Sequence, residues 1–250
     1  MDNLSDTVRE WISETGLSPN QVSRRAGISQ STMSRVLAGH VDPTAGTLTE
    51  IALACGFELD FAARPSSSPD AARAARVMLE AGYPDDEGDE LLKRWQQRLI
   101  RFSSASDPVT LLRTAARYAS PLLHPDVVLF AGDITVGHVA SAGDATRGRW
   151  AVSGAAGLTL PAPHESAPAT TILWTEDPRR AAQLLTDSPL ERTTRRKRAT
   201  VAVLLADPAL FVNAFTVGIV TYAAPMQLML DCIAQGGAVA QAALAEVEGW

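Results

Sequence analysis

The chain has 250 residues, of which 46% are apolar and 20% charged, and its net charge is −6. This composition is typical of a folded globular protein and excludes a largely disordered chain. Because domains cluster around about 100–150 residues, the length predicts two domains. No apolar run approaches the about 20 residues that span a bilayer, and the N-terminus lacks the features of a signal peptide. We therefore expect a cytoplasmic protein with no membrane partner.

Cysteine and histidine are few and are not arranged as metal ligands. Cys55 and Cys232 lie far apart without the spacing of a zinc site or a disulfide framework, so we expect both to be small buried residues. His124, His138 and His164 also lack paired ligand spacing. We interpret them as loop or surface residues, with a gathering at a metal or an effector as the alternative, and expect no metal and no cofactor.

The first 60 residues contain four patterns of short helices. Apolar residues at helical spacing predict a first helix at about 5–15. Ser18, Pro19 and Gln21 combine an N-cap, a proline at the first helical position and a capping-box glutamine, so a second helix runs to about Ala26.

The next two helices follow the same logic. Gly27 supplies a turn, Ser29 caps a third helix, and an apolar stripe ends at Gly39. A fourth apolar stripe stops at Gly56. These four helices predict a compact all-α domain over 1–62.

The spacing of the second and third helices suits a helix-turn-helix, in which a tight turn locks two helices so that the second can enter the major groove. Ser23 is small where the two backbones approach, and Gly27 sits at the turn. Five apolar residues fall where the two helices must pack, namely Val22, Ala26, Ile28, Met33 and Val36.

Residues 17–39, followed by Asp42-Pro43, Thr47-Leu48, Ile51-Ala52 and Ala54 to Phe57, carry a family pattern. Over about residues 4–60 the chain resembles the XRE-type, phage-repressor-like family of transcriptional regulators. The resemblance implies a lambda-repressor-like all-α fold and a double-stranded DNA partner. Ser23, where the family usually has alanine, and Pro19 are small departures that both fit a helix-turn-helix.

Outward-facing polar residues are the candidate DNA contacts. The side chains expected to contact base edges belong to the third helix: Ser29, Gln30, Ser31, Ser34 and Arg35. Those expected to hold the DNA backbone lie on or near the second helix: Asn20, Gln21, Arg24 and Arg25. Between Leu17 and Val41 there are three arginines and no acid, so a local basic face is compatible with the acidic total. The alternative is a protein-interaction module with these residues merely solvated.

The rest of the chain changes pattern twice. Residues 63–70 are rich in Pro and Ser and predict a linker, and three helical stretches at 70–82, 87–102 and 108–118 predict a helical connector or dimerisation element over 71–118. Short runs bounded by Gly, Asp and Pro then predict strands at 127–130, 170–174 and 200–205. Helical stretches are interspersed with these strands or follow them, at 178–186, 224–235 and 237–248. The predicted fold is multi-domain, with an α/β or α+β domain over 119–250.

Three features of this C-terminal part bear on function. The chain resembles the C-terminal part of the AbiEi-like DNA-binding antitoxins of type IV abortive-infection pairs at residues 150–156, 170–174 and 220–231. Those proteins generally start with a winged helix, so the N-terminus of this chain departs from their pattern. Enzymatic motifs are absent, and the adjacent carboxylates Glu176 and Asp177 are expected to diverge, so we expect no catalytic residues and no enzyme. A basic cluster at 192–198 is interpreted as a solvated loop, or as a second DNA-backbone contact.

These patterns predict a sequence-specific transcriptional regulator, a repressor, that binds a pseudo-palindromic operator as a homodimer. We expect its C-terminal domain to dimerise or to bind a protein partner or a small-molecule effector. The alternative function is an antitoxin that binds a cognate toxin and represses its own operon.

Overall fold

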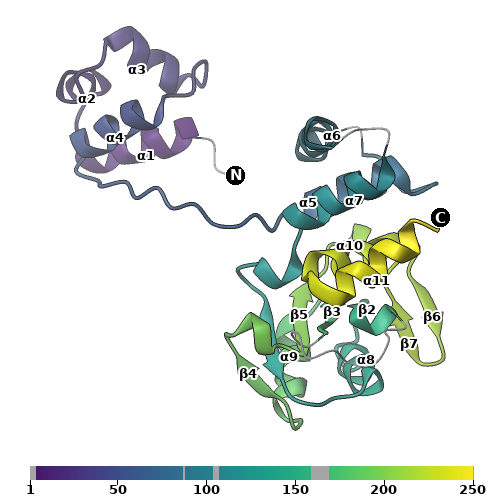
Figure 1. The fold of residues 1–250 in the computed structure, drawn as a ribbon. Helices are drawn as coiled ribbons and strands as arrows, with labels where there is room; N and C mark the ends of the chain where they lie inside the picture. Colours follow the sequence, from purple (N-terminus) through teal and green to yellow (C-terminus); the bar gives the residue numbers. More distant parts are fainter. Residues whose placement is uncertain (1–3, 87, 104–106, 159–168, 250) are drawn as a thin grey trace. The chain divides into compact units, whose positions relative to one another are not determined.

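The computed structural model describes residues 4–86, 88–103, 107–158 and 169–249. The chain divides into two compact units, Met1–Arg64 and Pro65–Trp250. Each of the two units (Figure 1) buries its own set of apolar residues.

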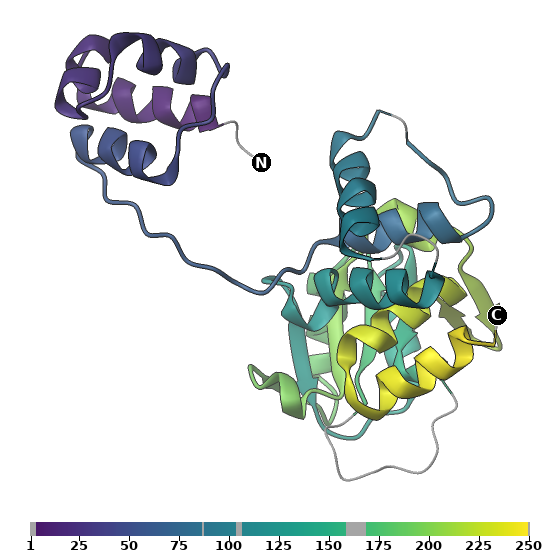
Figure 2. The same ribbon diagram turned by 45° about the horizontal axis from the view of Figure 1, so that its top comes forward.

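The first unit is a bundle of four helices: α1 (Leu4–Thr15), α2 (Pro19–Arg25), α3 (Gln30–Leu37) and α4 (Ala45–Ala54). Figure 2 shows these helices packed together, and all four contribute to one core, which contains Val8, Val22, Met33 and Ile51. The predicted N-terminal helical domain is therefore present, and its first three helices begin within a residue of the expected positions, in α2 and α3 because local caps determine those boundaries.

The second unit is built on one mixed seven-stranded sheet. Its strands are β1 (Val128–Ala131), β2 (Trp150–Gly154), β3 (Thr171–Thr175), β4 (Glu191–Thr193), β5 (Val201–Leu205), β6 (Phe215–Val217) and β7 (Val220–Tyr222). Their order across the sheet is β4-β1-β5-β3-β2-β7-β6. β3 runs parallel to β5 and β2 runs parallel to β7, whereas the other neighbouring pairs are antiparallel.

Helices cover both faces of this sheet. They are α5 (Pro69–Leu79), α6 (Glu90–Phe102), α7 (Pro108–Tyr118), α8 (Val136–Asp144), α9 (Pro178–Thr186), α10 (Pro225–Gln235) and α11 (Gly237–Val247). Short 3-10 helices are η1 (Pro121–Leu123), η2 (Ala155–Gly157), η3 (Arg196–Arg198) and η4 (Pro208–Phe211).

Successive side chains of the central strands point to opposite faces of the sheet, so the cores in which they pack show which helices cover which face. Val201 and Val203 of β5 pack in the core that contains α8 and α9, whereas Ala202 and Leu204 belong to a separate core on the opposite face. α10 lies on that opposite face, beside α5, α7 and α11 (Figure 1). The unit is thus a mixed α/β sandwich with helices on both sides of the sheet, as the sequence predicted in coarse terms.

The helices over 71–118, interpreted from the sequence as a connector, lie in the same compact unit as the sheet. The reason is the small-residue face of α5, where buried Ala71, Ala74 and Ala75 share one core with α7, α10 and α11. The residues expected to form the end of the linker are also held in this unit. Ser68 N donates to Tyr118 O at 2.8 Å, and Ser67 Oγ donates to Ser120 O at 2.6 Å.

Cys55 and Cys232 are both buried and unpaired, as expected. In the described ranges, no helix combines the length and the apolar character needed to cross a membrane.

Candidate nucleic-acid interface

The first helix of the motif, α2, begins at a complete capping box. Ser18 Oγ accepts a hydrogen bond from Gln21 N at 3.3 Å, and Gln21 Oε1 accepts one from Ser18 N at 2.8 Å. Pro19 occupies the first helical position, where no amide hydrogen is needed. The start of α2 is therefore specified by four consecutive residues.

The turn between α2 and α3 is tight because Gly27 adopts a φ of +65°, which side-chain-bearing residues rarely adopt. Beyond it, Ile28 N donates to Ser23 O at 3.0 Å, which closes the end of α2. Ser23 is fully buried and its hydroxyl donates to Asn20 O at 3.1 Å, so the serine replaces a small apolar residue without leaving an unsatisfied polar group.

α3 is oriented by its buried face. Met33 and Val36 are each 1% exposed and pack against residues of α1, α2 and α4. Ser29 caps the helix, because its Oγ accepts from Thr32 N at 3.0 Å. The polar residues on the opposite side of α3 are consequently turned to solvent, as in a helix that is to lie in a DNA groove.

All nine predicted DNA-contacting residues are exposed, and they fall into two groups. Gln21 and Ser29 already use a side-chain oxygen to cap α2 and α3. Ser31 Oγ lies 2.8 Å from Ser29 Oγ. Arg24 Nε donates to Asn20 O at 3.4 Å. The predicted contacts whose side chains form no hydrogen bond within the described part of the chain are Asn20, which accepts only through its main-chain carbonyl, Arg25, Gln30, Ser34 and Arg35.

The charge of the motif is not neutralised by neighbouring acids. Among the described residues of the first unit, the ion pair found is that between Arg9 and Asp6 on α1. Arg24, Arg25 and Arg35 take part in none of the ion pairs of the described chain. Exposed guanidinium groups without carboxylate partners are the side chains that phosphate groups attract.

Arg9 is a contributor that the sequence analysis missed. Its guanidinium donates to Leu37 O at the C-terminal end of α3, so α1 helps to hold that helix in place. A cation at a helix C-terminus also interacts favourably with the helix dipole. No local pattern indicates this role, because Arg9 and Leu37 are 28 positions apart.

Residues 3–64 match the family model for a helix-turn-helix domain. The first unit is a helix-turn-helix domain of the XRE type. The match spans the four helices and ends at the boundary between the two units. No curated protein and no solved structure matches the chain.

The helix-turn-helix assignment indicates that the protein binds DNA through its first unit. The match does not extend to the second unit, so the role of that unit has to be argued from its own residues. The resemblance of its sequence to AbiEi-like antitoxins stays a prediction.

Other residues singled out from the sequence have local partners in the second unit. Glu176 accepts hydrogen bonds from Arg149 N at 2.8 Å, from Arg149 Nε at 2.9 Å and from Arg149 Nη2 at 2.7 Å. The backbone bond, and after it the side-chain bonds, lower the pKa of its carboxyl group. Asp177 caps α9 by accepting from Arg180 N at 2.9 Å. Each of these adjacent carboxylates therefore holds a structural contact of its own.

His124 and His138 lie apart, each in a local contact. His124 Nδ1 accepts from Asp126 N at 3.3 Å, and His138 Nδ1 lies 2.8 Å from Thr135 Oγ1. His164 lies outside the described residues. Within those residues, no group of three or more His, Cys, Asp or Glu side chains is arranged to hold a metal ion.

The basic cluster is formed by exposed residues at the edge of the sheet, on β4 and η3: Arg192, Arg195, Arg196, Lys197 and Arg198. These side chains take part in none of the ion pairs of the described chain. The cluster is thus a strongly positive patch on an acidic protein.

Two buried charged residues of the second unit escaped the sequence analysis. Arg76 of α5 is 1% exposed, forms an ion pair with Glu80 at 2.7 Å, and donates to the carbonyls of Leu210 and Val212. Asp231 of α10 is 2% exposed. The sequence does not reveal that either residue is buried, because each lies within a predicted helix and no motif marks its position.

Proposed function

We propose that this protein is a sequence-specific transcriptional regulator, a repressor, that reads double-stranded DNA with α3 and holds the DNA backbone with α2. The observation that carries the proposal is the exposed polar face of α2 and α3, whose arginines form no ion pair in the described chain. Gln30 and Arg35 project from the exposed side of a helix whose other side is anchored by Met33 and Val36. Glutamine can bond bidentately to adenine, and arginine can bond to guanine or to a phosphate.

The proposal assigns different roles to the two helices. Gln30, Ser34 and Arg35 read base edges, together with Ser29 and Ser31 at the start of α3. Asn20, Gln21, Arg24 and Arg25 hold phosphates and so set register without carrying sequence information. The protein acts in the cytoplasm as a homodimer on a pseudo-palindrome with half-sites about 34 Å apart. The second unit dimerises or binds a partner or effector, and the protein is not an enzyme.

The experiment is selection of binding sequences from random double-stranded DNA by the full-length protein at near-physiological salt. The wild-type protein should enrich a two-fold symmetric motif. Gln30→Ala should lose preference at one position of each half-site, at a cost of roughly 1–3 kcal/mol. Arg24→Ala should weaken binding to all sequences alike. It should also reduce the slope of log K against log salt concentration by about one, as expected for the loss of one phosphate contact.

Matched controls come from the second unit. Gln97 and Arg117 are exposed residues of α6 and α7, and replacing either by Ala should leave the motif and the affinity unchanged. An enriched motif that Gln30→Ala does not alter would refute base reading by α3. If no motif is enriched at all, sequence-specific regulation by this chain alone is wrong, and capture of a cognate partner would favour the antitoxin alternative.

A further inference from the structure

The second unit contains a cavity of about 800 Å³, within the size range of small-molecule sites. It lies at the carboxyl ends of the adjacent parallel strands β3 and β5, where Trp174, Leu205 and Ala206 line it. The chain leaves these two strands on opposite faces of the sheet. After β3 it enters α9, which packs in one core, and after β5 it enters η4, whose Leu210 packs in the other. Such a switch point between parallel strands is the place where open α/β sheets generally bind ligands.

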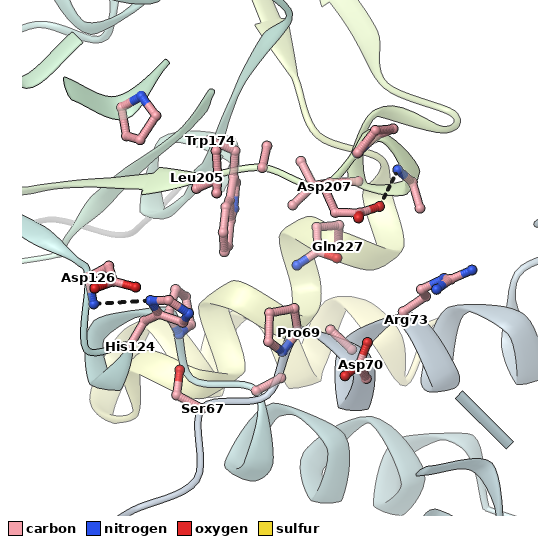
Figure 3. Close-up of a pocket in the computed structure, with 18 of the residues that line it drawn as sticks. Ser67, Pro69, Asp70, Arg73, His124, Asp126, Trp174, Leu205, Asp207 and Gln227 are labelled. Carbon is pink, nitrogen blue, oxygen red and sulfur yellow. Dashed lines mark hydrogen bonds between the residues drawn. The ribbon is translucent and has the colours of Figure 1, made fainter. Parts of the chain in front are cut away.

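The cavity combines an apolar wall with hydrogen-bond acceptors. Trp174 and Leu205 supply the apolar wall, and Leu205 is 63% exposed despite its size. The acceptors come from the starts of three helical segments, with Asp70 on α5, Asp207 before η4 and Gln227 on α10. Figure 3 shows the side chain of Gln227 between those of Asp70 and Asp207 in this view.

Gln227 lines the cavity with a side-chain amide. The residue is only 5% exposed, and its Nε2 donates to Asp231 Oδ1 at 2.9 Å. That contact orients the side-chain amide, and its Oε1 forms no hydrogen bond with any other residue that the structure describes. A carbonyl oxygen in the wall of a cavity that has no donor can accept a hydrogen bond from a ligand that brings an N–H or O–H group.

Three aspartates line the cavity, Asp70, Asp126 and Asp207, and none of them forms an ion pair with the neighbouring arginines in the described chain. Arg73 is paired with Asp89 at 2.6 Å, and Arg76 is paired with Glu80. Asp70 and Asp207 occur in none of the ion pairs of the described chain.

Burial raises the pKa of Asp70, and the negative charge of Asp89 raises it further, whereas Arg73 and a hydrogen bond from Ser68 lower it and the charge of Asp207 raises it least. A cation in the cavity would relieve this repulsion. Arg179, an exposed residue of α9, is the remaining cation of the lining without a carboxylate partner in the described residues.

We propose that this cavity binds a small organic amine in its protonated form. An ammonium group has three N–H donors and no acceptor, which matches the three acceptors Asp70, Asp207 and Gln227 Oε1. The apolar part of the ligand packs on Leu205 and on the ring of Trp174, and an aromatic ring also attracts a neighbouring cation. The proposal concerns the second unit alone and does not depend on DNA binding by the first.

The test is isothermal titration calorimetry of the full-length protein, without DNA, against three probes of similar shape and different charge. The probes are phenethylamine, 2-phenylethanol and 3-phenylpropanoate. Phenethylamine should bind at least about ten-fold more tightly than either of the other two. Asp70→Asn and Asp207→Asn should each weaken its binding by about ten-fold or more, whereas an asparagine at 207 can still cap η4.

The control is Asp144→Asn, which removes a carboxylate from the exposed end of α8 and should leave the affinity unchanged. Arg179→Ala should leave amine binding unchanged or strengthen it. Circular dichroism establishes that each variant is folded. The proposal is overturned if phenethylamine does not bind at millimolar concentration, if the neutral or the anionic probe binds equally well, or if Asp144→Asn weakens binding as much as Asp70→Asn.

Discussion

Asp231 is a buried carboxyl group whose ionisation can be followed through the stability of the second unit. It accepts hydrogen bonds from Ser153 Oγ at 2.6 Å, from Trp174 Nε1 at 2.8 Å and from Gln227 Nε2 at 2.9 Å. Burial raises its pKa from 3.8 to about 6, although these three donors, and more weakly the charge of Arg76, act to lower it. The desolvation of the carboxylate is therefore only partly offset by its partners.

The direction of the pH effect follows from this raised pKa. Between about pH 3.8 and about pH 6 the folded protein holds a proton on Asp231 that the unfolded chain has released. The contribution of Asp231 to the free energy of unfolding is then greatest below about pH 3.8 and is lost as the pH rises through about 6. A difference of about 2 pKa units corresponds to about 3 kcal/mol.

Asp231→Asn removes the charge and keeps the size of the side chain. The asparagine Oδ1 can accept from Ser153 and Trp174, and a flip of the Gln227 amide lets its Oε1 accept from the new Nδ2. Relative to wild type, we expect the variant to gain up to about 3 kcal/mol in free energy of unfolding above about pH 6 and to gain little near pH 4.

The assay is urea unfolding followed by tryptophan fluorescence from about pH 4 to about pH 8, in a Trp11→Phe background. The remaining tryptophans then all belong to the second unit. Asp144→Asn is the control for loss of an exposed carboxylate. Destabilisation by Asp231→Asn at neutral pH, or a difference from wild type that does not change with pH, would refute the desolvation argument.

Three further predictions concern contacts of both units. Arg76→Met should lower the free energy of unfolding of the second unit by about 3–5 kcal/mol, because it removes the cation paired with Glu80 and the donor to the carbonyls of Leu210 and Val212; urea unfolding measures this, and Arg117→Met should have little effect. Ser29→Ala should destabilise α3 by about 1 kcal/mol through loss of its cap, seen as faster amide exchange over 30–37, whereas Ser34→Ala, which removes no cap, should not. Replacing Arg195, Arg196 and Lys197 together by Ala should reduce operator affinity and its salt slope if the basic cluster contacts DNA; unchanged binding would show it to be a solvated edge of the sheet.

The helix-turn-helix could be predicted from the sequence because the signals that specify it act between residues close together in the chain. The capping box joins Ser18 to Gln21, the cap of α3 joins Ser29 to Thr32, and the turn needs only Gly27. Each of these signals acts over three or four positions, and the apolar stripes between them define which side of each helix is buried. The exposure of Gln30 and Arg35 follows from that pattern, whereas their contacts with DNA stay predictions.

The sequence predicted strands β1, β3 and β5 of the second unit but not the five-residue strand β2, whose apolar run ends at Ser153 and Gly154. β1, β3 and β5 carry continuous apolar runs because helices cover both faces of the sheet. β4, β6 and β7 have three residues each, too few for alternation to stand out from a loop.

By itself, the sequence determined the four N-terminal helices, their polar face and the mixed α/β character of the remainder. Only the tertiary structure decided that β5 lies between β1 and β3, that α5 joins the core of the second unit, and that Arg76 meets a carbonyl 136 positions away. The same holds for the cavity, whose acceptors Asp70, Asp207 and Gln227 come from three distant segments. The physical reason is the distance along the sequence between the interacting residues. Caps, turns and apolar stripes arise within a few residues, whereas strand order and buried polar contacts depend on which distant segments pack together.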